Sequence, residues 1–273
     1  MPPREAAPRG LPTRTEKVPK LWLIIAPSTD TSALWAFDGL KAAGLAPLEF
    51  VSAEALGSAR YWEHRLGTGG VSVKFVLEDG RTFCNSRVRG VLNRLVSAPL
   101  ESVACAARCD RDYAVHETLA LYLSWMHSLP GPLLNRPTPQ GLCGRWRHSS
   151  EWVWLAGRAG LRVETYRQRG SDPVDLGYKS LAPCNKPVLS AIVCGRQVFG
   201  AQFPPDVQAG CIRLAELSET DLLGIEFYSG PRHAWTFAHA TPLPDLRIGG
   251  WALIQCFARG LRNGTPEQEV ATA

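Results

Sequence analysis

The hydrophobic pattern predicts a βαβ unit near the start of the chain. Leu21–Pro27 is an unbroken apolar run, typical of a strand buried on both faces in a parallel sheet. A helix is predicted over Ser32–Ala43, with Ser28–Thr31 as its capping segment, and a second strand over Pro47–Val51. Strand, helix and strand within about thirty residues predict an α/β layer.

The middle of the chain alternates helix-like and strand-like patterns. Ala53–Gly67 and Gly144–Gly160 are predicted as helices. Val71–Leu77 alternates apolar and polar residues, and with Thr82–Cys84 it predicts a hairpin. Asp110–Leu129 predicts a long amphipathic helix that ends before a proline.

The last third is organised into short strands and a final helix. Four runs separated by glycine- and proline-bearing turns are predicted as strands: Val188–Val193, Gln197–Gln202, Leu223–Tyr228 and Ala234–His239. Ala252–Leu261 has the amphipathic pattern of a closing helix.

Asn-Arg occurs twice after an apolar run, once within Arg89–Leu95 and again in Leu133–Pro137, which reads LLNRP. With the glycine, proline and strand spacing of the last third, this pattern resembles the ATP-grasp superfamily. The resemblance implies an α/β (α+β) fold, in which a pre-ATP-grasp-like βαβ domain precedes a shortened ATP-grasp-like domain. We expect these domains at residues 21–137 and 138–262, between a disordered leader (1–20, rich in Pro and Arg) and a disordered tail (263–273).

The resemblance also implies where a nucleotide and a metal would bind. Lys179, in a segment similar to a family strand whose lysine reaches the phosphates, is the first candidate for the nucleotide. Arg145 and Arg147 lie nearest to the place of a second family lysine, which this chain lacks. Glu226, His239 and Thr241 occupy the positions of the magnesium ligands. The resemblance therefore implies ATP and a divalent metal as cofactors, while the catalytic residues stay unknown.

The chain departs from the family pattern in two further places. Between Val163 and Lys186 there is no glycine-rich loop and no acidic hinge, so the lid over the triphosphate is expected to be missing. His239 and Thr241 replace the usual Glu and Asn, which makes a poor magnesium site because that ion prefers oxygen ligands from carboxylates.

Composition changes this picture little. The net charge of +5 is mild, and the basic excess lies in Arg-rich segments that suit phosphate, nucleotide or an acidic peptide. The eight cysteines lack metal-type spacing, and no secretory or membrane-spanning segment is recognised. We therefore expect reduced thiols in a cytoplasmic protein without a membrane partner.

Two main functions follow. The first is a degenerate ATP-grasp-like protein, or pseudoenzyme, that acts as a non-catalytic binding or scaffold partner in a peptide- or small-molecule-modifying pathway. The alternative is a compact ATP-dependent ligase that joins a carboxylate to an amine or thiol through an acyl phosphate, with a partner chain supplying the lid. A nucleic-acid partner is not expected, because no recognised binding module accompanies the basic segments.

Overall fold

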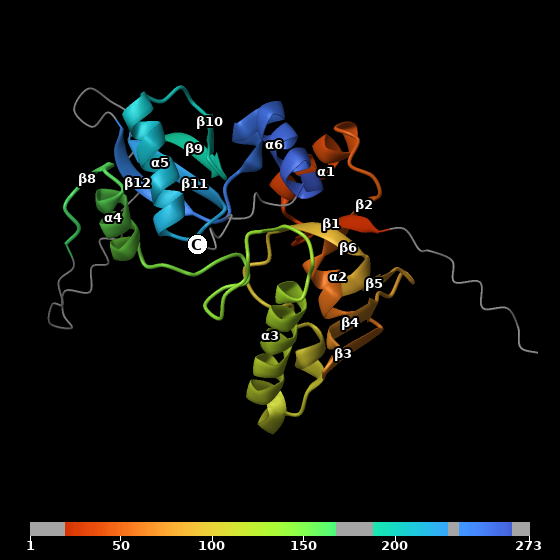
Figure 1. Ribbon diagram of the computed structural model, residues 1–273. Helices are drawn as coiled ribbons and strands as arrows, with labels where there is room; N and C mark the ends of the chain where they lie inside the picture. The colour runs from red at the N-terminus through yellow and green to blue at the C-terminus, as the bar shows by residue number, and fades with distance from the viewer. Residues whose placement is uncertain (1–19, 168–187, 229–234, 264–273) are drawn as a thin grey trace, which may run out of the picture.

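The computed structural model describes residues 20–167, 188–228 and 235–263 (Figure 1). Its first sheet has the strand order β2-β1-β6-β7, and every neighbouring pair in it is parallel. The strands are β1 (Leu21–Ala26), β2 (Leu48–Ser52), β6 (Val88–Asn93) and β7 (Leu133–Leu134). With α1 (Thr31–Ala42) between β1 and β2, the predicted βαβ unit is confirmed.

Strand β1 is buried on both faces, which explains its unbroken apolar sequence. Leu21, Leu23 and Ile25 enter one hydrophobic core, whereas Trp22 and Ile24 enter another on the opposite face. Alternate side chains of a strand point to opposite faces, so a strand between two cores has no polar positions.

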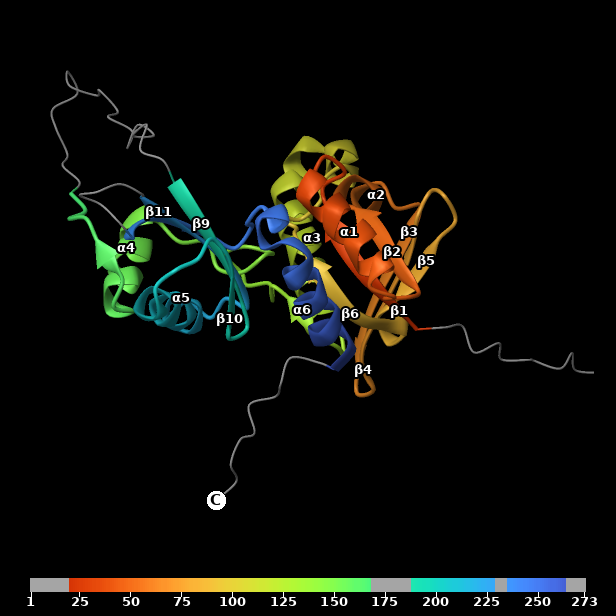
Figure 2. The same cartoon turned by 90° about the horizontal axis from the view of Figure 1, so that it is seen from above.

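Helices from both ends of the chain cover the second of these faces (Figures 1 and 2). α1 packs against α6 (Gly250–Asn263), the predicted closing helix, and both contribute to the core around Trp22. The Trp22 indole Nε1–H donates a hydrogen bond of 2.9 Å to the Leu261 carbonyl near the end of α6. The first sheet thus completes its core with the last described helix.

The opposite face carries α3 (Arg111–His127), a one-turn helix α2 (Ala53–Gly57) and a small sheet. This sheet is antiparallel, with the order β3-β4-β5. Its strands are β3 (Tyr61–Gly67), β4 (Gly70–Val76) and β5 (Thr82–Cys84). The predicted hairpin of β4 and β5 and the long helix α3 are confirmed.

The prediction of a helix over residues 53–67 is wrong. Only residues 53–57 are helical, and β3 pairs with β4 along its whole length, with Trp62 opposite Phe75. Phe75 is buried against Trp125 of α3, with ring centroids 4.7 Å apart. Pairing with a strand that is anchored in the core overrides a weak local helix preference.

The second large sheet has the order β10-β9-β11-β12-β8. Its strands are β8 (Arg162–Val163), β9 (Val188–Cys194), β10 (Gln197–Gly200), β11 (Leu222–Tyr228) and β12 (Thr236–Thr241), which confirms the four predicted strands. Helices α4 (Ser149–Arg158) and α5 (Pro205–Leu217) pack on one face, where Ile225 and Phe227 enter a third core. Helix α4 begins five residues later than predicted, because His148 caps it by accepting from the Ser150 N–H.

The two Asn-Arg pairs lie side by side at the ends of β6 and β7, and they bind the two sheets together. Asn93 Nδ2 donates to the carbonyls of Asn135 (3.0 Å) and Leu142 (2.6 Å). Asn135 in turn exchanges two hydrogen bonds with the backbone of Leu222 at the start of β11, at 2.8 and 2.7 Å. Both asparagine side chains are buried.

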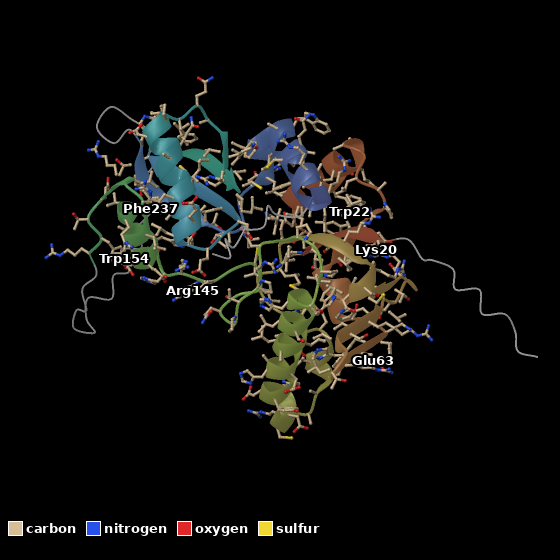
Figure 3. All side chains as sticks on the ribbon, viewed as in Figure 1. Lys20, Trp22, Glu63, Arg145, Trp154 and Phe237 are labelled. Atoms are coloured by element: carbon tan, nitrogen blue, oxygen red, sulfur yellow. The ribbon has the colours of Figure 1, made fainter. Side chains whose placement is uncertain are left out.

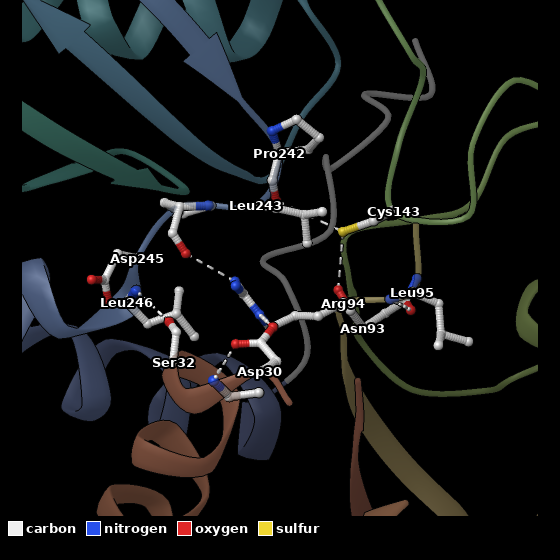
Figure 4. A network of polar contacts seen from close by, with 12 residues as sticks. Asp30, Ser32, Asn93, Arg94, Leu95, Cys143, Pro242, Leu243, Asp245 and Leu246 are labelled. Atoms are coloured by element: carbon white, nitrogen blue, oxygen red, sulfur yellow. Dashed lines mark hydrogen bonds and ion pairs between the residues drawn. The ribbon is translucent and has the colours of Figure 1, made fainter. Parts of the chain in front are cut away.

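Arg94 extends this network toward α1 (Figure 4). Its Nε donates to the Asp30 carboxylate at 2.7 Å, and its Nη1 donates to the Pro244 carbonyl at 3.0 Å. Asp30 also caps α1 by accepting from the Ala33 N–H at 2.9 Å. The Leu246 N–H donates to Ser32 Oγ of the same helix at 2.7 Å.

The predicted division at residues 137/138 stays a prediction, and α6 packs on the first sheet although it follows that boundary. The predicted leader and tail lie outside the described residues, apart from Lys20 and Asn263. None of the helices within the described ranges is long and apolar enough to span a bilayer.

Candidate functional site

An open pocket of about 230 Å³ lies where the segment leading into α4 meets the end of β12. Four of the residues predicted to bind a nucleotide or a metal line it: Arg145, Arg147, His239 and Thr241. Figure 3 shows Arg145 on the segment before α4. Glu226 lies on β11, opposite His239 in the strand register. Lys179 lies outside the described residues.

Arg147 is engaged within the protein. Its Nη1 forms an ion pair with Glu151 in the first turn of α4, and its Nη2 donates to the Ser218 carbonyl at 3.0 Å. The guanidinium also lies over the Trp152 ring, 5.6 Å from its centroid, and the side chain is only 6% exposed. Arg147 therefore ties α4 to the end of α5.

Arg145 and Trp146 are presented to solvent beside the pocket. The Arg145 side chain is 54% exposed, and its Nη2 lies 3.9 Å from Glu151 Oε1. Trp146 is 68% exposed although it is a large hydrophobic residue. An exposed cation next to an exposed indole is the composition found at the centre of many protein interfaces.

Glu226, His239 and Thr241 lie on the face of the second sheet that points away from α4 and α5. Their neighbours in sequence, Ile225 and Ala240, enter the third core on the opposite face. Glu226 lies opposite His239 and Thr241 lies opposite Gly224 in one continuous register, which shifts only after Glu226. The Thr241 hydroxyl accepts a hydrogen bond of 3.1 Å from the Leu243 N–H.

Sequence patterns did not identify the wall of the pocket formed by Cys143. This thiol donates to the Asn93 carbonyl at 3.1 Å, and burial raises its pKa to about 11. Cys143 therefore stays protonated near neutral pH and is not an activated nucleophile. The residue that follows Cys143 in the sequence is Gly144, which also lines the pocket. Its φ of 96° is a backbone conformation that favours glycine.

A second, mainly apolar groove of about 220 Å³ adjoins the pocket. Val96, Gln140 and Gly141 line both, so the two hollows share one rim. The groove continues to Leu100 and to Leu119 of α3. The combined surface has an apolar end and a cationic end.

We compared the chain with known proteins to identify the type of fold. No family model and no curated protein matches the sequence. Solved structures do match: macrocyclase MdnB from Microcystis aeruginosa MRC is similar at 14% identity and a TM-score of 0.65, over 90% of this chain and 100% of that one. The chain has an ATP-grasp-like fold.

Two further neighbours carry bound peptides. Macrocyclase MdnC with precursor peptide MdnA, from the same organism, has 15% identity and a TM-score of 0.64, over 89% of this chain and 99% of that one. A Chryseobacterium gregarium RiPP-associated ATP-grasp ligase in complex with ADP and a leader and core peptide has 11% identity and a TM-score of 0.62, over 88% and 97%. At these identities the likeness shows the fold alone.

The described residues do not fit the magnesium–nucleotide complex that an ATP-grasp fold implies. Glu226 offers one carboxylate, His239 an imidazole and Thr241 a hydroxyl that already accepts a hydrogen bond, whereas Mg²⁺ prefers several oxygen ligands. Within the described ranges, no group of three or more His, Cys, Asp and Glu side chains is placed to hold a metal ion. The segment expected to lack the lid falls largely on residues 168–187, outside the described residues.

Proposed function

We propose that this chain is a non-catalytic peptide-binding partner in a peptide-modifying pathway. One observation carries the proposal: both terminal nitrogens of Arg147 are already bound within the protein. Nη1 pairs with Glu151, and Nη2 donates to the Ser218 carbonyl. A guanidinium held in this way contributes to the packing of α4. It would have to leave both partners before it bound a phosphate.

The pocket and the adjoining groove support binding of a peptide. The cationic end, with Arg145 and Trp146, suits an acidic side chain, and the apolar end, near Leu100 and Leu119, suits a hydrophobic one. The neighbours MdnC and the Chryseobacterium ligase are similar in fold and hold precursor or leader peptides. We propose the same class of ligand for this chain.

A displayed library of random peptides, selected on the purified full chain, tests this function. We expect enrichment of peptides that carry Asp or Glu near an apolar residue. Trp146→Ala and Arg145→Gln should each weaken binding of an enriched peptide about thirtyfold, since an interface hot spot contributes about 2 kcal/mol.

The matched control is Trp154→Ala. Trp154 lies on α4, is 58% exposed and does not line the pocket, so its loss should leave binding unchanged. No enrichment over an unrelated protein would contradict the proposal, as would an equal loss of binding in Trp154→Ala.

The alternative, a compact ATP-dependent ligase, is favoured by one observation. Arg145 is exposed beside a pocket that also contains His239, the strand partner of Glu226. The ligase predicts that ATP with magnesium, manganese or zinc raises the melting temperature by mass action, and that Glu226→Ala or Lys179→Ala abolishes the rise. The absence of a shift at millimolar nucleotide would remove this alternative.

A further inference from the structure

Strand β3 is an open edge of the small antiparallel sheet. In the order β3-β4-β5 it pairs with β4 on one side, and among the described residues no strand pairs with its other side. Figure 1 shows β3 at the side of this sheet away from β5. The strand is seven residues long and contains no proline and no bulge, which are features that protect an edge strand from further pairing.

Two hydrogen bonds of Asn85 show which backbone groups of β3 face outward. Its Oδ1 accepts from the Val73 N–H at 3.3 Å, and its Nδ2 donates to the Val71 carbonyl at 2.6 Å, so these β4 groups point away from β3. Val73 lies opposite His64, and Val71 lies opposite Leu66. Because backbone groups alternate in direction along a strand, His64 and Leu66 present their N–H and C=O groups to the open edge.

Trp62 belongs to the same set, because it lies two residues before His64. The side chains of alternate residues also share one face of the strand. His64 Nε2 lies 2.9 Å from Ser124 Oγ, which places this face toward α3. Trp62 and Leu66 are large hydrophobic residues on that face, yet both are exposed. A further strand at this edge would bury them.

The opposite face of β3 carries two opposite charges. Arg65 Nη2 lies 2.7 Å from Glu63 Oε1, and the arginine side chain is largely exposed. Water screens such a pair, so these charges lose little when they exchange one partner for another. Both charges are therefore available to a strand that pairs with β3.

We propose that two copies of this chain associate through β3, as antiparallel strands related by a two-fold axis at His64. In this register Trp62 lies opposite Leu66 of the partner subunit, and Glu63 lies opposite Arg65 of the partner subunit. Symmetry makes each pair occur twice. His64 and the partner's His64 form a hydrogen-bonded pair across the axis, as their outward backbone groups require. Three strands from each copy then form one sheet.

The charges select this register over its neighbours. An axis at Glu63 uses the same outward backbone groups but places Glu63 opposite Glu63 of the partner subunit. An axis at Arg65 places Arg65 opposite the partner's Arg65. Like charges directly opposite each other destabilise a strand pair. Only the register centred on His64 pairs opposite charges and also pairs the two exposed apolar residues.

This association is independent of the proposed peptide-binding function, because no residue of β3 lines the pocket or the adjoining groove. One pair of edge strands is small beside the roughly 800 Å² per partner of a typical stable interface. We therefore expect a dissociation constant in the micromolar range.

Sedimentation velocity of the purified full chain, at concentrations from about 1 to 200 μM, tests the proposal. We expect a reversible equilibrium between monomer and dimer. Hydrogen exchange of residues 61–67 should slow as the concentration rises, because pairing covers the outward N–H groups of β3. Trp146→Ala should leave the equilibrium unchanged, since Trp146 lines the pocket.

Charge reversal tests the register. Glu63→Arg and Arg65→Glu should each weaken self-association about tenfold, because each places like charges opposite each other twice. An equimolar mixture of these two variants should form dimers again, since every cross-strand pair between them has opposite charges. The matched control is Arg213→Glu, an exposed arginine on α5 that should leave association unchanged.

Leu66→Pro tests the backbone pairing. The Leu66 N–H faces outward, so proline removes a donor from the open edge and keeps the hydrogen bonds to β4. This variant should stay monomeric up to about 200 μM, with a circular dichroism spectrum like that of the unaltered chain.

Three results would overturn the proposal. One is a chain that stays monomeric over the whole range of concentration. Another is a dimer that neither charge reversal weakens. The third is a mixture of Glu63→Arg and Arg65→Glu that associates no better than either variant alone. Because the charge variants alter only exposed side chains, these results do not depend on whether Leu66→Pro folds.

Discussion

Arg94 is a buried cation held by groups from two distant parts of the chain. Its side chain is 5% exposed, and it binds the Asp30 carboxylate and the Pro244 carbonyl. A buried ion pair adds little net stability compared with apolar residues, because both charges lose their hydration. Removal of one partner is costly, since it leaves the other charge buried and unpaired.

We therefore expect substitutions of Asp30 to be strongly destabilising. Asp30→Asn removes the charge but keeps an oxygen that can cap α1, so it should lower the free energy of unfolding by about 3 kcal/mol. Asp30→Ala also removes the cap and should cost about 1 kcal/mol more. Urea unfolding of both variants measures the difference.

The control for this pair is Glu63→Ala, which removes the solvent-exposed ion pair with Arg65. Its cost should be much smaller than that of Asp30→Asn, because water screens exposed charges. Equal losses in Asp30→Asn and Glu63→Ala would show that Arg94 does not depend on its partner.

At the scale of elements, α6 has one buried face and one exposed face. Leu253, Phe257 and Leu261 are buried against α1 and the first sheet, whereas Trp251 is 50% exposed. The last helix is therefore part of a core that begins with β1.

Phe257→Ala should lower the free energy of unfolding by about 3–5 kcal/mol, because it leaves a cavity in that core. Trp251→Ala on the same helix should change it by less than about 1 kcal/mol. Chemical denaturation of the two variants is the measurement. A similar cost for both would mean that α6 does not pack as described.

The sequence predicted helices and strands correctly where neighbouring residues alone determine the apolar pattern. β1 lies between two cores and α3 begins and ends at polar or proline signals, so both were found from local residues. β3 was predicted as helix, because its identity depends on pairing with β4 across the Gly70 turn. α5 was not predicted: its apolar residues follow a helical spacing after Pro205, but Gly210 in its middle is unfavourable in a helix.

The candidate site was harder to predict, because it depends on partners far away in the sequence. The basic residues Arg145 and Arg147 were identified, and both line the pocket. Their different states follow from Glu151, which is four residues after Arg147, and from the Ser218 carbonyl, which no local pattern connects to Arg147. The repeated Asn-Arg pair was noticed, but the backbone bonds from Asn135 to Leu222 require the folded sheets.

For the whole molecule, one of the three cores contains residues from both large sheets. The core around Trp22 also contains Ile192 and Leu222 of the second sheet, together with α6. Partial unfolding of either sheet would expose this shared surface. We expect the sheets to unfold together.

Urea unfolding should accordingly show a single transition. Tryptophans report on all three cores, through Trp125, Trp22 and Trp152, while circular dichroism reports on the helices. The two signals should give superimposable curves with one midpoint. Two separate midpoints would show that the predicted division near residue 137 marks units that unfold independently.

The packing of α6 on the first sheet also sets an order of events during synthesis. Trp22 and Ile24 are synthesised long before α6, because more than two hundred residues separate them from this helix. Until then, the nascent chain exposes one apolar face of its parallel sheet, and such surfaces aggregate or recruit chaperones. The chain thus stays dependent on protection until α6 has been translated.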